Sequence, residues 1–201
     1  MEQIAAIILA AGVGSRMGST KQLLRAGGQS LVRRACIAAI EAGCKPVIVV
    51  TGSNSNAVAA EIADLSVQPA LNADWSAGIG SSIRSGLAAA LAEAPSISAV
   101  ILMLCDQPHL NAKILRDLMT TWSTAGNPMA ACHYSGAPGS PCCFANSMFD
   151  QLSRLPSTDG AKKLLLANPE LVTSIPWPQG EEDLDTPADW QHFCQSNPPP
   201  T

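Results

Sequence analysis

The segment that most constrains the fold is the apolar run Ile4–Leu9, which leads directly into a chain of small residues. A short, continuous apolar run of this kind predicts a strand buried on both faces of a parallel sheet. The segment 10–21 that follows reads A-A-G-V-G-S-R-M-G-S-T-K. Small side chains let backbone N–H groups approach a phosphate closely, and Arg16 and Lys21 bring charges that can neutralise it. The segment therefore predicts a loop that holds a triphosphate.

Two better-known phosphate loops do not fit this segment. The dinucleotide fingerprint G-x-G-x-x-G would need a glycine at position 17, where Met17 stands. A Walker A loop needs Gly, Lys and Ser/Thr in succession, but Gly18 and Lys21 are separated by two residues. An ordinary strand-to-helix turn with surface cations is the alternative interpretation.

Strand and helix patterns alternate along almost the whole chain. Strands are expected at 4–9, 47–51, 67–71, 100–104 and 171–175, with an antiparallel hairpin formed by 128–134 and 141–144. Helices are expected from Ser30 to Gly43, at 56–65, from Ser81 or Ser82 to 92, from Asn111 to 122, and at 147–152, 161–167 and 187–195. The alternation predicts an α/β fold: one domain, residues 1–196, with a mostly parallel Rossmann-like sheet, helices on both faces and a small antiparallel hairpin. Residues 197–201 are expected to be a flexible tail.

The loops with the most distinctive residues all follow the carboxyl ends of expected strands. They are 10–21, 52–54, 72–82 and 106–108. In open α/β sheets, ligands bind in the crevice beyond these strand ends. The fold is therefore expected to gather the candidate chemistry on one edge of the sheet.

Two aspartates are candidate metal ligands. Asp106 follows the apolar strand 100–104 and stands before Gln107 and Pro108, where a carboxylate can hold a divalent ion. A turn or helix-capping role is its alternative. Asp185 is the second candidate, although the sequence Asp-Thr-Pro at this position is also a good helix start.

Composition limits the class of protein. A chain of 201 residues with 47% hydrophobic residues suits one domain, and a net charge of −4 argues against a nucleic-acid binder. Seven cysteines without a C-x-x-C pair suggest core packing in a reducing cytosol. With no signal-peptide pattern and no apolar stretch of about 20 residues, we expect a cytoplasmic protein without a membrane partner.

Together these motifs resemble the MobA-like nucleotidyltransferases, and among them most closely the molybdenum cofactor cytidylyltransferases. The pieces that carry the resemblance are 9–21, 72–83 (N-x-D-W-x-x-G-I-G-S-S-I), 105–108 and 183–190 (D-x-D-T-P-x-D-W). The letters Ala10-Ala11-Gly12 are similar to the cytidylyl branch, whereas guanylyl-transferring relatives tend to have Ala-Gly-Gly. The fold implied is that of the nucleotide-diphospho-sugar transferases.

The resemblance implies a Mg²⁺-dependent transfer of CMP from CTP to the terminal phosphate of molybdopterin, or the molybdenum cofactor, with release of pyrophosphate. It implies Arg16, Lys21 and Asp106 as catalytic residues, and Asp106 and Asp185 as metal ligands. The nucleotide would be bound by Leu9, Ala10, Ala11, Gly12, Val13, Gly14, Arg16, Lys21, Gly80, Ser81, Ser82 and Asp106. Asn72 and Asp74 begin the second nucleotide loop and are candidates to line the pocket. Ser81 and Ser82 would either cap the next helix or touch the base or ribose.

The chain departs from the family pattern in the half that would bind the acceptor. Ser140 stands where many relatives have His, and Lys162 replaces Arg. Open alternatives are therefore GTP as donor, a sugar or polyol phosphate as acceptor, or a non-catalytic chaperone that hands a pterin cofactor to a molybdoenzyme. An NAD-dependent reductase is a third class, which Met17 disfavours.

Overall fold

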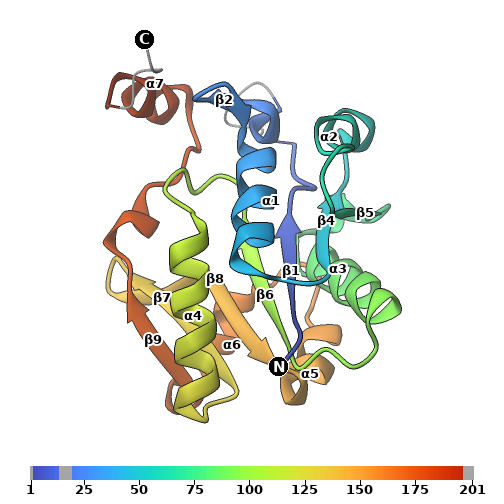
Figure 1. Ribbon diagram of the computed structural model, residues 1–201, viewed down its shortest axis with the longest axis vertical. Coiled ribbons are helices and arrows are strands. Elements are labelled where there is room, and N and C mark those ends of the chain that lie inside the picture. The colour runs from blue at the N-terminus through green and yellow to red at the C-terminus, as the bar shows by residue number, and fades with distance from the viewer. Residues whose placement is uncertain (1, 14–19, 197–201) are drawn as a thin grey trace.

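A seven-stranded sheet forms the centre of the molecule, of which the computed structural model describes residues 2–13 and 20–196. Its strands lie in the order β5 (Gln68–Leu71), β4 (Val47–Thr51), β1 (Ile4–Leu9), β6 (Ala99–Leu104), β8 (Ala137–Ala145), β7 (Met129–Tyr134) and β9 (Val172–Pro176). Every neighbouring pair is parallel except the two pairs that include β8. The mostly parallel α/β sheet is confirmed (Figure 1).

The strand β1 lies inside the sheet, and its apolar residues are buried on both faces. It pairs with β4 and β6 in parallel register, so that Leu9 lies opposite both Val50 and Leu104. Ile7 and Ile8 point to opposite faces of the sheet, and both are fully buried. The carboxyl ends of the three central strands β4, β1 and β6 therefore reach the same edge.

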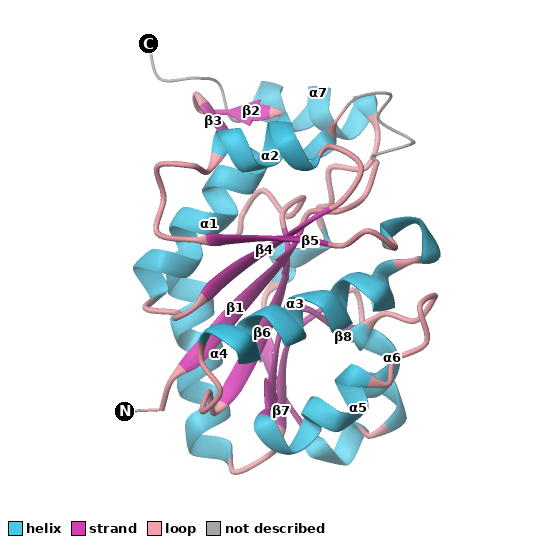
Figure 2. Cartoon of the chain, turned by 90° about the vertical axis from the view of Figure 1, so that its right-hand side faces the viewer, coloured by secondary structure: helices cyan, strands magenta, loops and turns pink. Residues whose placement is uncertain are grey.

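Helices cover both faces of the sheet. The helices are α1 (Leu31–Ala42), α2 (Ser55–Glu61), α3 (Ile79–Glu93), α4 (Ala112–Ala125), α5 (Phe149–Ser153), α6 (Ala161–Ala167) and α7 (Pro187–Ser196). Short 3₁₀ turns lie at η1 (Lys21–Leu23), η2 (Trp75–Ala77), η3 (Asn146–Met148), η4 (Pro169–Leu171) and η5 (Pro178–Glu181). α1 and α4 pack on one face, and α3, α5 and α6 on the other (Figures 1 and 2).

Several helix ends lie where the sequence predicts them. The Ser30 hydroxyl accepts a hydrogen bond from the Arg33 backbone N–H at 3.2 Å, and so caps α1. Gly43 ends that helix in the left-handed region, with φ of 90°. Asn111 caps α4 by accepting from the N–H groups of the second and third helical residues.

Other boundaries differ from the expectation. α3 begins at Ile79, after Gly78 with φ of 123°, so Ser81 and Ser82 lie inside the first turn and do not cap the helix. The expected hairpin forms, but its turn contains only Ser135 and Gly136, and both strands belong to the main sheet. α2 ends at Glu61, earlier than the expected 65.

A separate two-stranded sheet, β2 (Arg25–Ala26) and β3 (Gln29–Ser30), was not expected. Gly27 and Gly28 both have positive φ, which suits the two-residue turn of a tight hairpin. This hairpin lies beside α7 at the end of the molecule toward which β1 points (Figure 1).

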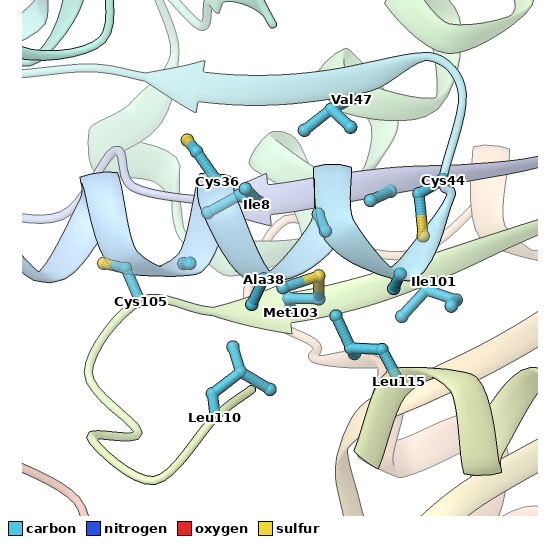
Figure 3. Close-up of a cluster of buried hydrophobic side chains, with 14 of the residues drawn as sticks. Ile8, Cys36, Ala38, Cys44, Val47, Ile101, Met103, Cys105, Leu110 and Leu115 are labelled. Atoms are coloured by element: carbon cyan, nitrogen blue, oxygen red, sulfur yellow. The ribbon is translucent and has the colours of Figure 1, made fainter. Parts of the chain in front are cut away.

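The cysteines behave as small core residues. Cys36, Cys44 and Cys105 pack among apolar side chains on the α1 face (Figure 3). Cys142 and Cys143 belong to opposite faces of the sheet, as alternation along a strand predicts. All seven thiols are free, which confirms the core-packing interpretation for the six that are buried.

No helix in residues 2–13 and 20–196 is both long and apolar enough to cross a membrane. The expected tail, 197–201, lies outside the described residues, as do Gly14 and Arg16.

Candidate functional site

A cavity of about 420 Å³ opens at the carboxyl edge of the sheet, between the ends of β1 and β6 and the start of α3. Its lining residues are Leu9, Ala11, Gly12, Val13, Lys21, Gln22, Trp75, Ser76, Gly78, Ile79, Ser82, Leu104, Cys105, Asp106 and Asp185. We call this space the first cavity. Its place agrees with the expected ligand crevice.

The first cavity brings together most of the residues singled out in the sequence. Eight of them line it: Leu9, Ala11, Gly12, Val13, Lys21, Ser82, Asp106 and Asp185. Ala10, Gly80 and Ser81 are not among the lining residues. Asn72 and Asp74 also lie outside the lining.

The charged centre of the cavity is one lysine between two aspartates. Lys21 Nζ lies 2.6 Å from Asp106 Oδ2 and 2.5 Å from Asp185 Oδ1. The Lys21 side chain is only 10% exposed. Burial opposes its charge, but the two carboxylates outweigh burial and raise the pKa of Lys21 above its usual value. The lysine is therefore held as a cation.

Backbone contacts explain how Asp185 reaches Asp106 from far along the chain. The Leu184 N–H donates to the Asp106 carbonyl at 3.1 Å, which joins the two segments. Leu184 is fully buried in a small cluster with Ala26, Leu31 and Phe193. This cluster attaches the segment before α7 to the start of α1.

The start of α7 fixes the backbone at Asp185. Thr186 and Asp189 form a reciprocal capping pair: Asp189 Oδ2 accepts from the Thr186 N–H at 2.7 Å, and Thr186 Oγ1 accepts from the Asp189 N–H at 3.2 Å. The same carboxylate accepts from the Asp185 N–H at 3.2 Å. The Thr186 hydroxyl also donates to this carboxylate at 2.8 Å, and this bond, with those from the two backbone N–H groups, holds the pKa of Asp189 below its usual value. The expected helix start is thus confirmed, and it also orients Asp185.

Gln22 was not singled out in the sequence, yet it is a buried part of the site. Its amide nitrogen donates to the Gly12 carbonyl at 2.7 Å. The contact joins the two described ends of the glycine-rich segment. Only the position of Gln22 directly after Lys21 could have pointed to it.

A network of hydrogen bonds shapes the loop 72–78 and the start of α3. The buried Asn72 amide donates to Ser81 Oγ at 2.8 Å and to Ser82 Oγ at 3.0 Å. Ser81 Oγ in turn lies 2.7 Å from the Gly78 carbonyl. Ser81 and Asn72 therefore hold the loop from behind, while Ser82 reaches the cavity. A hydroxyl that accepts one hydrogen bond keeps its own hydrogen for donation to a ligand.

Trp75 forms a wall that the sequence analysis did not assign. It lines the first cavity and packs against Gly52, where a Cβ would come within 2.8 Å of Trp75 Cβ and Cγ. The glycine after β4 is thus required by the close approach of the indole. An aromatic side chain in a nucleotide-sized cavity can stack on a base.

The acidic pair has the donor chemistry of a magnesium site. Asp106 Oδ1 is buried and has no hydrogen-bond partner within the described part of the chain, so it keeps lone pairs for a cation. The described residues contain no group of three or more His, Cys, Asp or Glu side chains that could hold an ion alone. Mg²⁺ commonly uses one or two carboxylates with substrate phosphates. Asp106 and Asp185 fit that pattern.

Asp183 lies near this pair but lines a separate cavity. Burial, with the nearby charge of Asp106, raises its pKa to about 6.

Comparison with known proteins agrees with this geometry. Residues 6–172 match the family described as the MobA-like NTP transferase domain. Nicotine blue oxidoreductase of Paenarthrobacter nicotinovorans is 31% identical over 192 residues, 91% of this chain and 92% of that protein. Molybdenum cofactor cytidylyltransferase of Escherichia coli K12 is 26% identical over 191 residues, 94% of this chain and 95% of that protein. A crystal structure of Rv0371c from Mycobacterium tuberculosis H37Rv in complex with manganese has a TM-score of 0.79 at 27% identity, and the match covers 96% of this chain and 99% of that one.

Proposed function

We propose that this chain, which belongs to the MobA-like NTP transferase family and is a nucleotidyltransferase, transfers CMP from CTP to the terminal phosphate of molybdopterin or the molybdenum cofactor. An oxygen of that phosphate would attack the α-phosphorus of CTP, forming a new P–O–P linkage. The bond from the α-phosphorus to the bridging β-oxygen would break, and pyrophosphate would leave. The similarity to a molybdenum cofactor cytidylyltransferase supports this acceptor and donor.

The observation that carries the proposal is the charged centre of the first cavity. Lys21, Asp106 and Asp185 meet within hydrogen-bond distance beside the glycine-containing loop. Phosphoryl transfer depends on positioning and charge neutralisation more than on covalent participation by the protein. One buried cation and two carboxylates in the first cavity meet that requirement.

Each residue would have a separate task. Lys21 would neutralise the β- and γ-phosphates and the charge that develops on the leaving pyrophosphate. Backbone N–H groups of Ala11–Gly14 would hold phosphate oxygens, with Arg16 as a second cation. Ser82 would offer its hydroxyl to the base or ribose, and Trp75 would stack on the base.

We also propose that Asp106 and Asp185 hold a divalent cation, Mg²⁺ in the cell. When bound, the ion would neutralise phosphate oxygens of the substrate. The manganese in the structure of Rv0371c supports the use of a divalent ion.

The proposal extends to the nucleotide donor, the protein that receives the product, the compartment and the working domain. Ala10-Ala11-Gly12 supports CTP over GTP. A molybdoenzyme or its maturation chaperone would receive the product in the cytoplasm. Residues 1–196 would form the working domain and 197–201 a tail.

The deciding experiment is a pyrophosphate-release assay with each of the four NTPs, Mg²⁺ and purified molybdopterin. We expect release with CTP, and a fall of about 10²–10³-fold for Asp106→Asn. The exposed Asp117→Asn variant is the matched control, because Asp117 pairs with Lys113 on the surface of α4. Pyrophosphate release with a sugar or polyol phosphate, and not with molybdopterin, would show that this phosphate is the acceptor. Tight pterin binding without any release would indicate a chaperone.

A reductase is the second candidate, since one relative is named nicotine blue oxidoreductase and is 31% identical to this chain. The assay for it is oxidation of NADH or NADPH with a heteroaromatic acceptor. Oxidation of NADH or NADPH by the protein, without pyrophosphate release from any NTP, would overturn nucleotidyl transfer.

A further inference from the structure

The two aspartates proposed to hold the metal ion belong to segments that contact each other at three points. Asp106 lies between β6 and α4, and Asp185 lies between β9 and α7. One contact is the hydrogen bond from the Leu184 N–H to the Asp106 carbonyl. The other two are side-chain contacts, made by Gln107 and His109 to the second segment. Neither of these two residues has a task in the proposed reaction.

Gln107 is buried directly after Asp106, with only 3% of its surface exposed. Its amide nitrogen donates to the Gly180 carbonyl at 3.0 Å and to the Ser140 carbonyl at 3.1 Å, which ties the residue to η5 and β8 at once. Its oxygen Oε1 is buried without a partner in the described part of the chain. An apolar side chain of the same length would avoid the cost of that oxygen, so the two N–H donors explain why a glutamine stands here.

His109 makes the third contact, three positions after Asp106. Its ring nitrogen Nε2 lies 2.7 Å from Glu182 Oε2, and because a carboxylate only accepts, Nε2 carries the hydrogen. The same ring makes an edge-on contact with Phe193 on α7, with ring centroids 6.0 Å apart. The imidazole therefore contacts the chain on both sides of Asp185, at Glu182 before it and at Phe193 after it.

Attachment of α7 to the rest of the protein does not depend on these polar contacts. Leu184 and Phe193 already anchor this part of the chain in a buried apolar cluster, and the Thr186–Asp189 pair caps the helix. Hydrogen bonds add direction, because they fix both the distance and the angle between two segments, whereas hydrophobic contact is non-directional. Gln107 and the His109–Glu182 pair therefore set how the two segments lie against each other.

The relative position of the two segments matters because each supplies one carboxylate. Lys21 Nζ reaches both carboxylates, so their oxygens already converge on one point. Mg²⁺ demands near-ideal octahedral geometry at short distances, and a site with two protein carboxylates tolerates little displacement of either one. Residues that orient metal ligands typically change metal affinity by about 10–100-fold when they are removed.

We propose that Gln107 and the His109–Glu182 pair are positioning residues of the metal site. They hold the backbones of Asp106 and Asp185 at the separation at which one divalent ion binds both carboxylates. Neither Gln107 nor His109 touches the ion or the substrate in this role. The inference rests on the proposed function, because it concerns the metal ion that the proposed reaction uses.

The test measures metal affinity apart from turnover. The probe is Mn²⁺ alone, and the electron paramagnetic resonance signal of the free ion gives its dissociation constant. We expect His109→Phe and Gln107→Met each to raise this constant about tenfold or more. Neither variant removes a negative charge, and loss of a neutral or positive imidazole would by charge alone leave cation binding equal or tighter. Weaker binding therefore reports the geometry of the carboxylates.

A second readout and two control variants accompany the metal titration. Exchange of the Leu184 amide hydrogen, followed by NMR in metal-free buffer, reports the backbone contact between the segments and should be faster in both variants. His133→Phe, at an exposed histidine on β7, and Gln151→Met, at an exposed glutamine on α5, should change neither readout. If Gln107→Met does not fold, His109→Phe decides alone, because the His109 side chain is 32% exposed and its replacement keeps a ring.

The outcomes separate this inference from the proposed function. Mn²⁺ affinity that falls in both variants, without pyrophosphate release by the wild-type protein from any NTP, supports the positioning role and overturns the transfer reaction. Pyrophosphate release by the wild-type protein, with a Mn²⁺ affinity that neither variant changes, supports the reaction and overturns the positioning role. A wild-type protein that releases pyrophosphate but does not bind Mn²⁺ would also overturn it.

Discussion

The Lys21 ammonium lies 2.6 Å from the Asp106 carboxylate, beyond the carboxyl end of the central strand β6. The same nitrogen reaches Asp185, so one cation stands between two carboxylates that belong to distant parts of the chain. A divalent ion placed between these carboxylates would compete with the lysine for the same oxygens. Metal binding would then free Lys21 to turn toward substrate phosphates.

The first prediction concerns Lys21→Met. Without the ammonium, the two carboxylates repel each other in a partly buried site, and we expect the melting temperature to fall in EDTA. Mg²⁺ or Mn²⁺ should restore stability more in the variant than in the wild type, because the ion replaces the lost charge. Turnover should remain about 10²–10³-fold lower even with metal.

Differential scanning fluorimetry with and without metal checks this. Lys113→Met, which breaks an exposed pair with Asp117, is the control and should show no metal-dependent change. A Lys21→Met protein that melts like the wild type in EDTA would contradict the cation's structural role.

The second prediction concerns Arg84, which ties α3 to the loop 155–157 that precedes α6. Arg84→Met removes both of its hydrogen bonds to that loop while keeping much of the aliphatic length. Because the loop contacts Gly78 and Gly80 on one side and leads into α6 on the other, we expect KM to rise for CTP and for the acceptor together. Steady-state kinetics with each substrate varied in turn gives both constants.

Arg154→Met serves as the comparison for that measurement, since Arg154 pairs with Asp150 on the surface. A rise in the KM for only one of the two substrates would show that the loop positions the binding site of that substrate alone. Arg84→Lys keeps the charge but not the two-pronged geometry, so only partial recovery is expected.

The alternation of strands and helices was predictable because each element carries a local signal. β1 and β4 have the predicted bounds, since continuous apolar runs are typical of strands buried on both faces. Ser30 and Asn111 marked helix starts through hydrogen bonds to nearby backbone. The start of α3 was predicted wrongly because Gly78, in a left-handed conformation, ended the loop before the serines.

The site was predictable only in part, because its key contacts join residues far apart in sequence. The sequence identified Lys21, Asp106 and Asp185 separately, but nothing local indicates that one lysine contacts both carboxylates. The Leu184–Asp106 backbone contact and the packing of Trp75 on Gly52 arise from tertiary structure alone.

The third prediction concerns the pH dependence that Asp183 contributes. Its pKa is raised from 3.8 to about 6 by burial and by the charge of Asp106. Between these values the folded protein binds more protons than the unfolded chain, so this contribution to stability falls as pH rises from about 4 to 6. Asp183→Asn removes the ionisation. Its gain in melting temperature over the wild type should therefore be larger near pH 7.5 than near pH 4.

Thermal melts across this pH range in metal-free buffer check the sign. Asp150→Asn, at an exposed carboxylate on α5, is melted in parallel as the comparison variant. A stabilisation by Asp183→Asn that is largest near pH 4 would contradict the raised pKa.

The last prediction concerns the thiols. Burial raises the pKa of Cys36, Cys44 and Cys132 to about 12, and it also raises those of Cys105, Cys142 and Cys143. Because the thiolate is the reactive form, these six should react very slowly at neutral pH. Cys194 is exposed on α7. We expect one fast thiol per native chain with Ellman's reagent and seven after unfolding in guanidinium. Cys194→Ser should remove the fast phase without a change in turnover, and a second fast thiol in the native protein would show that a core cysteine is accessible.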